Sequence, residues 1–83
     1  MDRELAIRAR GGDHDAFAEL IARRIGRLTA TARLIVRDED RAQDAVQDAL
    51  IDAWRDIRGL RDPDRLDGWL HRLIVNSCLD LVR

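Results

Sequence analysis

The sequence predicts an all-α protein, a compact bundle of three long helices with a short helix at the N-terminus. Apolar residues recur at three- and four-residue steps along three long stretches, which is the spacing of a buried helix face. The chain contains one Pro, five Gly and no Tyr, and 37% of its residues are charged. Because 83 residues support only one small hydrophobic core, we expect a single domain.

The first two helices are predicted on either side of a glycine pair. Residues 2–10 form the short helix, and Gly11-Gly12 is expected to end it. Asp13 is a good N-cap for the next helix, which is expected to continue to about Val36. Gly26 weakens the middle of this long helix and is expected to permit a close crossing by a neighbour.

The second helix has one apolar stripe and one basic side. The stripe comprises Phe17, Leu20, Ile21, Ile25, Leu28, Ala32 and Ile35. The residues expected to face outward are Arg23, Arg24 and Arg27.

The third helix carries two different faces. It is expected to begin within Asp38-Glu39-Asp40, which offers capping side chains, and to end near Arg58-Gly59. One side is an unbroken apolar stripe made of Ala42, Ala45, Val46, Ala49, Leu50, Ala53, Trp54 and Ile57. The other side carries Asp44, Gln47, Asp48, Ile51 and Arg55. An Ile surrounded by carboxylates and an amide suits a surface that docks on a basic, partly apolar partner, although single exposed Ile residues are also common.

A charged loop containing Pro63 separates the third helix from the last. Pro63 disfavours helical angles at Asp62, and Asp64 is the expected cap of the last helix. That helix is still periodic at Arg83, and its apolar side holds Leu66, Trp69, Leu70, Leu73, Ile74, Ser77 and Leu81. A second face is formed by Trp69, Arg72, Asn76, Asp80 and Arg83. The core is expected to comprise Phe17, Leu20, Ile21, Leu28, Val46, Leu50, Trp54, Leu70, Leu73 and Ile74.

The residue types do not favour catalysis or a metal site. His14 and His71 have no Cys or second His at metal-ligand spacing, and there is no glycine-rich phosphate loop. Cys78 lies beside Ile74 and Leu81 and is expected to be a small core residue, which fits a reducing compartment. No apolar stretch is long enough to cross a bilayer, and no signal peptide is visible.

Charge is distributed unevenly along the chain. The net charge is −1, and all fifteen basic residues are Arg, a side chain that makes bidentate contacts with phosphate and carboxylate. Residues 38–56 carry seven acidic residues against two Arg. A near-neutral chain argues against strong nonspecific binding of nucleic acid, but it is compatible with a weak DNA contact made beside a larger partner.

Two strings resemble region 2 of the sigma-70 family, and most closely its extracytoplasmic-function (ECF) class. They are DEDRAQDAVQDALIDAWRDI at 38–57 and WLHRLIVNSCLDLVR at 69–83. The first matches the family pattern at Asp44, Gln47, Asp48 and Ala53-Trp54. The second matches it at Trp69-Leu70, Asn76, Asp80 and Arg83. The resemblance covers nearly the whole chain.

The resemblance implies two binding surfaces. The polymerase-binding residues would be Asp44, Gln47, Asp48 and Ile51, docked on the β′ clamp helices of the RNA polymerase core. The DNA-binding residues would be Arg61, Asp62, Arg65, Trp69, Arg72, Asn76 and Arg83, which recognise the non-template strand of the promoter −10 element. A flipped base would be held by Asn76 and the stretch 61–67, with Trp69 as support and with Arg72 and Arg83 on phosphates.

The resemblance also sets the remaining expectations. Residues 1–83 would be one sigma region 2 domain in the cytoplasm, without enzyme activity, cofactor or membrane contact. The second DNA-binding domain of the family is not in this sequence, and we expect the domain to be part of a longer protein. The alternative function is a sigma-like helical module that acts mainly through a regulator such as an anti-sigma factor.

Overall fold

The computed structural model describes residues 2–83, and that part of the chain is helical, with no strand. Its elements are α1 (Asp2–Arg10), α2 (His14–Ala22), α3 (Ile25–Val36), α4 (Glu39–Asp56) and α5 (Leu66–Val82). Two short 3₁₀ turns, η1 (Ile57–Gly59) and η2 (Pro63–Arg65), connect α4 to α5. The prediction of an all-α fold is confirmed.

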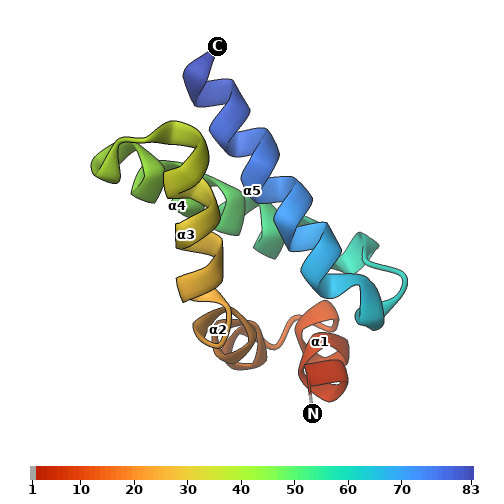
Figure 1. The fold of residues 1–83 in the computed structure, drawn as a ribbon. Coiled ribbons are helices and arrows are strands. Elements are labelled where there is room, and N and C mark those ends of the chain that lie inside the picture. The colour runs from red at the N-terminus through yellow and green to blue at the C-terminus, as the bar shows by residue number, and fades with distance from the viewer. Residues whose placement is uncertain (1) are drawn as a thin grey trace.

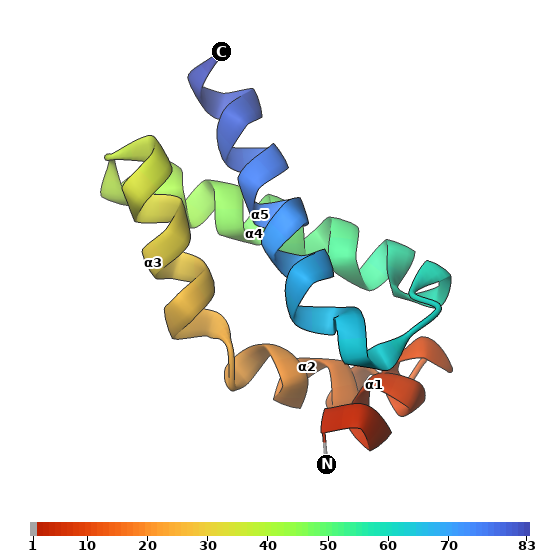
Figure 2. The same ribbon diagram turned by 45° about the vertical axis from the view of Figure 1, so that its right-hand side comes forward.

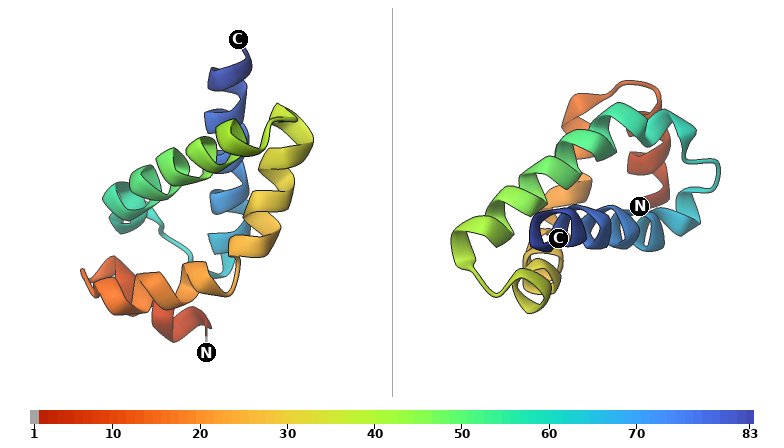
Figure 3. Two further views of the ribbon diagram at one scale, coloured as in Figure 1. Left: turned by 90° about the vertical axis from the view of Figure 1, so that its left-hand side faces the viewer. Right: turned by 90° about the horizontal axis from the view of Figure 1, so that it is seen from above.

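The helices form two groups. Figure 1 shows α3, α4 and α5 packed together, while Figure 2 shows α1 and α2 side by side across the lower end of that group. The last turns of α5 project beyond the other helices (Figure 3). The loop that joins α4 to α5 lies at the opposite end of α5, where α1 contacts both of its turns.

The core is continuous through all five helices. Seven of the ten residues expected in it are buried: Phe17, Leu20, Ile21, Leu28, Val46, Leu70 and Ile74. The other three, Leu50, Trp54 and Leu73, are half-buried and pack against its edge. Much of the buried side of α4 is alanine, namely Ala42, Ala45, Ala49 and Ala53. These small side chains let the backbone of α4 approach its neighbours closely.

Two of the three helix caps predicted from the sequence are present in the structure. Asp13 accepts a hydrogen bond from the Ala16 backbone N–H (3.1 Å), and Asp38 accepts one from that of Arg41 (3.1 Å). Both caps are as predicted. Asp64, the expected cap of α5, does not cap it; instead Asp62 accepts a hydrogen bond from the Asp64 backbone N–H (2.9 Å) and closes η2 one turn earlier. Pro63 at the first position of η2 favours this turn, since its ring fixes φ near the required value.

The prediction of one long helix from residue 13 to Val36 is wrong. The helix is interrupted at Arg23-Arg24, which separates α2 from α3. In a continuous helix the Leu20 carbonyl would accept the Arg24 backbone N–H. Here it accepts Nη1 of the Arg24 side chain (3.0 Å), and the Arg24 backbone N–H bonds to the Ile21 carbonyl (2.9 Å). The break turns Arg24 inward to 6% exposure, so its predicted outward position is also wrong.

Two smaller expectations at the break are wrong for the same reason. Ile25, placed in the apolar stripe, is 39% exposed. Gly26 is exposed, and nothing lies within 4 Å of where its Cβ would be, so no helix crosses there. Once the helix axis changes direction, residues after the break no longer continue the face of the residues before it.

Candidate functional site

The polar side of α4 is a negatively charged surface. Asp44, Gln47 and Asp48 are exposed, and Ile51 is 64% exposed. Their spacing of three and four residues places all four on one side of the 18-residue helix. Within residues 2–83, neither Asp44 nor Asp48 forms an ion pair with an Arg. The structure therefore brings the four residues predicted for protein docking onto one face, and its carboxylates are available to a basic partner.

Arg55 does not neutralise that surface. Its guanidinium lies 3.1 Å from Asp56 and 3.1 Å from Asp52. The hydrogen bond with Asp56 and the charges of both carboxylates raise the pKa of Arg55, and the same bond lowers the pKa of Asp56. Arg55 is thus paired at the C-terminal end of α4, away from Asp44 and Asp48.

Hollows flank this surface on two sides. Between α4 and α5 lies a hollow of about 290 Å³, lined by Asp48, Ile51, Asp52, Ser77, Asp80 and Leu81. Between α3 and α4 lies a more apolar hollow of about 380 Å³, lined by Ile25, Thr29, Gln43, Val46, Gln47 and Leu50. The exposed Ile25 belongs to this second hollow. Sequence periodicity missed it because the helix break is what turns Ile25 outward.

A third hollow lies where the loop meets α5. Its volume is about 430 Å³, and it is lined by Leu60, Asp64, Arg65, Gly68, Trp69 and Arg72. Three residues predicted for DNA binding, Arg65, Trp69 and Arg72, therefore meet in one place. Trp69 is half-buried, and nothing lies within 4 Å of a Cβ built on Gly68.

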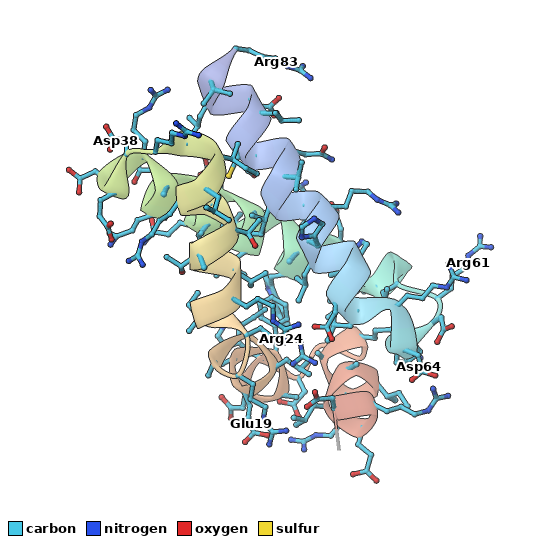
Figure 4. The ribbon with its side chains drawn as sticks, in the orientation of Figure 1. Glu19, Arg24, Asp38, Arg61, Asp64 and Arg83 are labelled. Carbon is cyan, nitrogen blue, oxygen red and sulfur yellow. The ribbon has the colours of Figure 1, made fainter. Side chains whose placement is uncertain are left out.

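The loop itself is fixed at its ends and exposed between them. Leu60 and Leu66 are buried in the core, with 6% and 3% exposure. Most of the segment 61–65 between them is exposed, and the labelled Arg61 points away from the body of the molecule (Figure 4). Its polar side chains are therefore presented to solvent from two fixed points.

The remaining predicted DNA contacts lie apart from this hollow. Asn76 is exposed one helical turn beyond Arg72 and does not line the hollow. Arg83 lies at the far end of α5 from the labelled Arg61 (Figure 4) and is 3.9 Å from Asp80. The predicted set thus divides into a cluster at the loop, an exposed amide one turn along α5, and an arginine at its end.

His14 and Cys78 each pack against other residues of the domain. His14 packs edge-on against Trp54, with ring centroids 5.1 Å apart. Cys78 is fully buried, and burial raises the pKa of its thiol, which matches its predicted place in the core. In residues 2–83 no group of three or more His, Cys, Asp or Glu is placed to hold a metal ion. No helix in that part of the chain is long and apolar enough to cross a membrane.

An all-helical bundle with an acidic face on α4 and a hollow at the loop before its last helix has a counterpart among known families. Residues 20–83 match the family model of sigma-70 region 2. That match covers most of the chain, and the chain therefore belongs to the sigma-70 family. The resemblance in the two sequence strings is confirmed.

Individual relatives place the similarity within that family. The chain is 40% identical over 82 residues to the ECF RNA polymerase sigma factor SigM of Mycobacterium tuberculosis, covering 99% of this chain and 42% of SigM. It is 39% identical over 83 residues to the RNA polymerase sigma factor CnrH of Cupriavidus metallidurans, covering 99% of this chain and 43% of CnrH. The chain thus spans about two-fifths of the length of these relatives. No solved structure matches it.

Proposed function

We propose that this domain docks on the RNA polymerase core through the polar face of α4 and recognises the promoter −10 element beside the loop and α5. The observation that carries the proposal is the match of residues 20–83 to sigma-70 region 2. It is supported by Asp44 and Asp48 on the exposed face of α4, which form no ion pair with the residues that the structure describes. Residues 1–83 would act as one domain, since α1 packs on α2 and contacts both turns of the loop. We propose that the domain acts in the cytoplasm and has no enzyme activity of its own.

Docking on the polymerase is supported by the chemistry of the α4 face. Asp44, Gln47 and Asp48 offer carboxylate and amide groups, and Ile51 adds an apolar contact at their edge. We propose that the partner is the β′ clamp helices, which would supply basic and apolar side chains. Charge complementarity of this kind mainly steers association and excludes wrong partners.

The docking test compares one double variant with a control variant that also replaces an acidic residue by Arg. Gln47→Ala with Asp48→Arg should weaken binding to isolated β′ clamp helices, because a reversed charge at a contact adds repulsion. Glu19→Arg is the control, since Glu19 lies on α2 at the other end of the molecule from Asp38 at the start of α4 (Figure 4). The measurement is a titration with circular dichroism as a check of folding. Unchanged affinity in the folded double variant would assign docking to a different face.

Promoter recognition is supported by the hollow of Leu60, Asp64, Arg65, Gly68, Trp69 and Arg72. Its volume of about 430 Å³ lies in the range of small-ligand pockets, roughly 300–1,000 Å³. A base released from the stack exposes its Watson–Crick edge and a face for stacking. We propose that the loop 61–67 contacts such a base at the hollow and that Asn76, which lies one helical turn beyond the hollow, contacts the base from outside it. Trp69 would support the base, and Arg72 and Arg83 would contact phosphates.

Two variants on one helix face separate base contacts from phosphate contacts. Asn76→Ala should reduce discrimination at one −10 position by about 1–3 kcal/mol, the range of good specific base contacts. Arg72→Ala should weaken all sequences alike. Both are measured on single-stranded −10 oligonucleotides that vary one base at a time, with core polymerase present. If Asn76→Ala keeps the base preference, specificity lies in the loop 61–67 instead.

A further inference from the structure

We propose that α1 holds the promoter-recognition loop in place, and that Arg10 is the main positioning residue. This inference rests on the proposed function of the loop. The family model matches from residue 20, so α1 lies outside the matched segment. Nevertheless α1 contacts both turns that border the loop, η1 and η2.

The Arg10 side chain forms hydrogen bonds with the backbone of the loop. It is the last residue of α1 and is half-buried. Its Nη1 donates to the Leu60 carbonyl (2.8 Å) and to the Arg61 carbonyl (3.1 Å). Within residues 2–83 it forms no ion pair, so these two carbonyls are the partners found for its charge. Contact with two consecutive carbonyls, fifty residues away in the sequence, fixes the direction in which the chain leaves Leu60.

Arg24 forms ion pairs that hold the other end of the loop, where α5 begins. Its side chain is 7% exposed, donates through Nε to Asp67 (2.6 Å) and donates through Nη2 to Asp2 of α1 (2.6 Å). A buried guanidinium must keep its carboxylate partners, because an unpaired buried charge is strongly unfavourable. The hydrogen bonds with Arg24 lower the pKa of Asp2. Asp67 is the second residue of α5, so this bridge links α1 to the helix start where the hollow opens.

The loop depends on these hydrogen bonds and ion pairs because it has few buried contacts of its own. Between the buried Leu60 and Leu66 most side chains are exposed, and the hydrogen bonds of η2 are local ones accepted by Asp62 and Pro63. Segments with few buried contacts open easily, whereas recognition of a base requires its contacts to be held within about 0.5 Å. Arg3 and Asp64 add an exposed pair at 3.3 Å, which contributes little by itself. Arg10 adds a hydrogen-bonded contact to the backbone at Leu60 and Arg61, where the exposed segment begins.

The test compares three variants in the presence of core polymerase. Arg10→Ala removes the grip on both carbonyls, and Arg10→Lys keeps a donor without the planar guanidinium. Arg8→Ala is the control, since Arg8 lies on the same helix, is exposed and pairs with Asp13 rather than with the loop. The readouts are the ratio of affinities for −10 oligonucleotides that differ at one base, the affinity for polymerase, and hydrogen exchange of the amides in 61–66.

Arg10→Ala should lower the ratio of affinities at least about fivefold, since small misplacements of binding groups are costly. It should speed exchange in 61–66 while polymerase affinity stays unchanged, and Arg10→Lys should recover part of the loss. A ratio unchanged in Arg10→Ala would overturn the inference. Parallel losses of stability, polymerase affinity and base preference would also overturn it, because they indicate a general folding role. If the wild-type domain shows no base preference with polymerase present, the proposed function itself is wrong.

Discussion

Arg24 is a buried charge at a position where the helical pattern places a surface residue. Its guanidinium contacts carboxylates from two different helices and a carbonyl of its own turn. Burial by itself would lower the pKa of Arg24, but the hydrogen bonds and charges of Asp67 and Asp2 outweigh burial and raise it. Arg24 therefore stays charged in the folded state and links α1 and α5 at the junction of α2 and α3.

Removing that charge should destabilise the domain in a pH-dependent way. Arg24→Met keeps an aliphatic side chain but loses the ion pairs, and it should cost about 1–3 kcal/mol at pH 7. Because the pKa of Asp2 is lowered in the folded state, its contribution is complete above the usual Asp pKa of about 3.9 and is lost as pH falls below it. The difference between wild type and variant should therefore be smaller at pH 3 than at pH 7.

Urea unfolding at the two pH values measures this difference. Arg27→Met is the matched control, because Arg27 is exposed and forms no ion pair with residues 2–83. It should change stability by no more than about 0.5 kcal/mol. An equal cost of Arg24→Met at both pH values would show that packing, rather than its pairing with Asp2, accounts for the role of Arg24.

At the scale of helices, the sequence predicted those whose ends have local causes. Gly11-Gly12 ends α1, with Gly12 at a φ of 100°, and Asp13 and Asp38 cap α2 and α4. These ends are determined by neighbours in sequence. The break at Arg23-Arg24 was missed because it depends on Asp2 and Asp67, which are 22 and 43 residues away. Asp62 was missed as a cap because η2 is a single turn, too short to show periodicity.

The same distinction applies to the candidate site. The α4 face was predicted correctly as a surface because four residues on one helix need only the helical repeat. The family resemblance grouped Asn76 with the stretch 61–67, whereas the residues that line the hollow include Arg65, Trp69 and Arg72. This grouping was not predicted, since the loop conformation is not set by a repeat. The contacts of Arg10 with the loop carbonyls were not predicted at all, because a side chain that bonds to backbone leaves no complementary charge in the sequence.

The alanine side of α4 gives a prediction for the packing of that helix. Ala49 is 2% exposed and faces the core, so Ala49→Leu adds atoms where the structure has no space. Overpacking of this kind costs roughly 1–3 kcal/mol, and thermal unfolding should occur at a lower temperature. The control is Ala18→Leu, on an exposed position of α2, which should leave the unfolding temperature nearly unchanged. Equal effects of the two substitutions would mean that α4 is not closely packed.

Across the whole molecule, positive and negative charges nearly balance. The net charge is −1, with acidic residues along α4 and arginines at the loop and along α5. Many of the remaining arginines are already paired with carboxylates of the same chain, as Arg33 is with Glu39 at 2.6 Å. A domain of this kind has little general attraction for the phosphate backbone. Docking on polymerase would supply the local concentration that its DNA contacts lack.

The salt dependence of DNA binding tests this arrangement. For single strands, the logarithm of affinity falls with the logarithm of salt concentration by about 0.7 for each phosphate contact. With two proposed phosphate contacts, Arg72 and Arg83, the slope should be about −1.4, and Arg72→Ala should halve it. Arg33→Ala should leave the slope unchanged, since the charge of Arg33 is neutralised by Glu39. The measurement is a fluorescence anisotropy titration of a single-stranded −10 oligonucleotide at several salt concentrations, with and without core polymerase. A steep slope for the isolated domain would mean that many arginines contact DNA together, and the division into two contacts proposed for α5 would then be wrong.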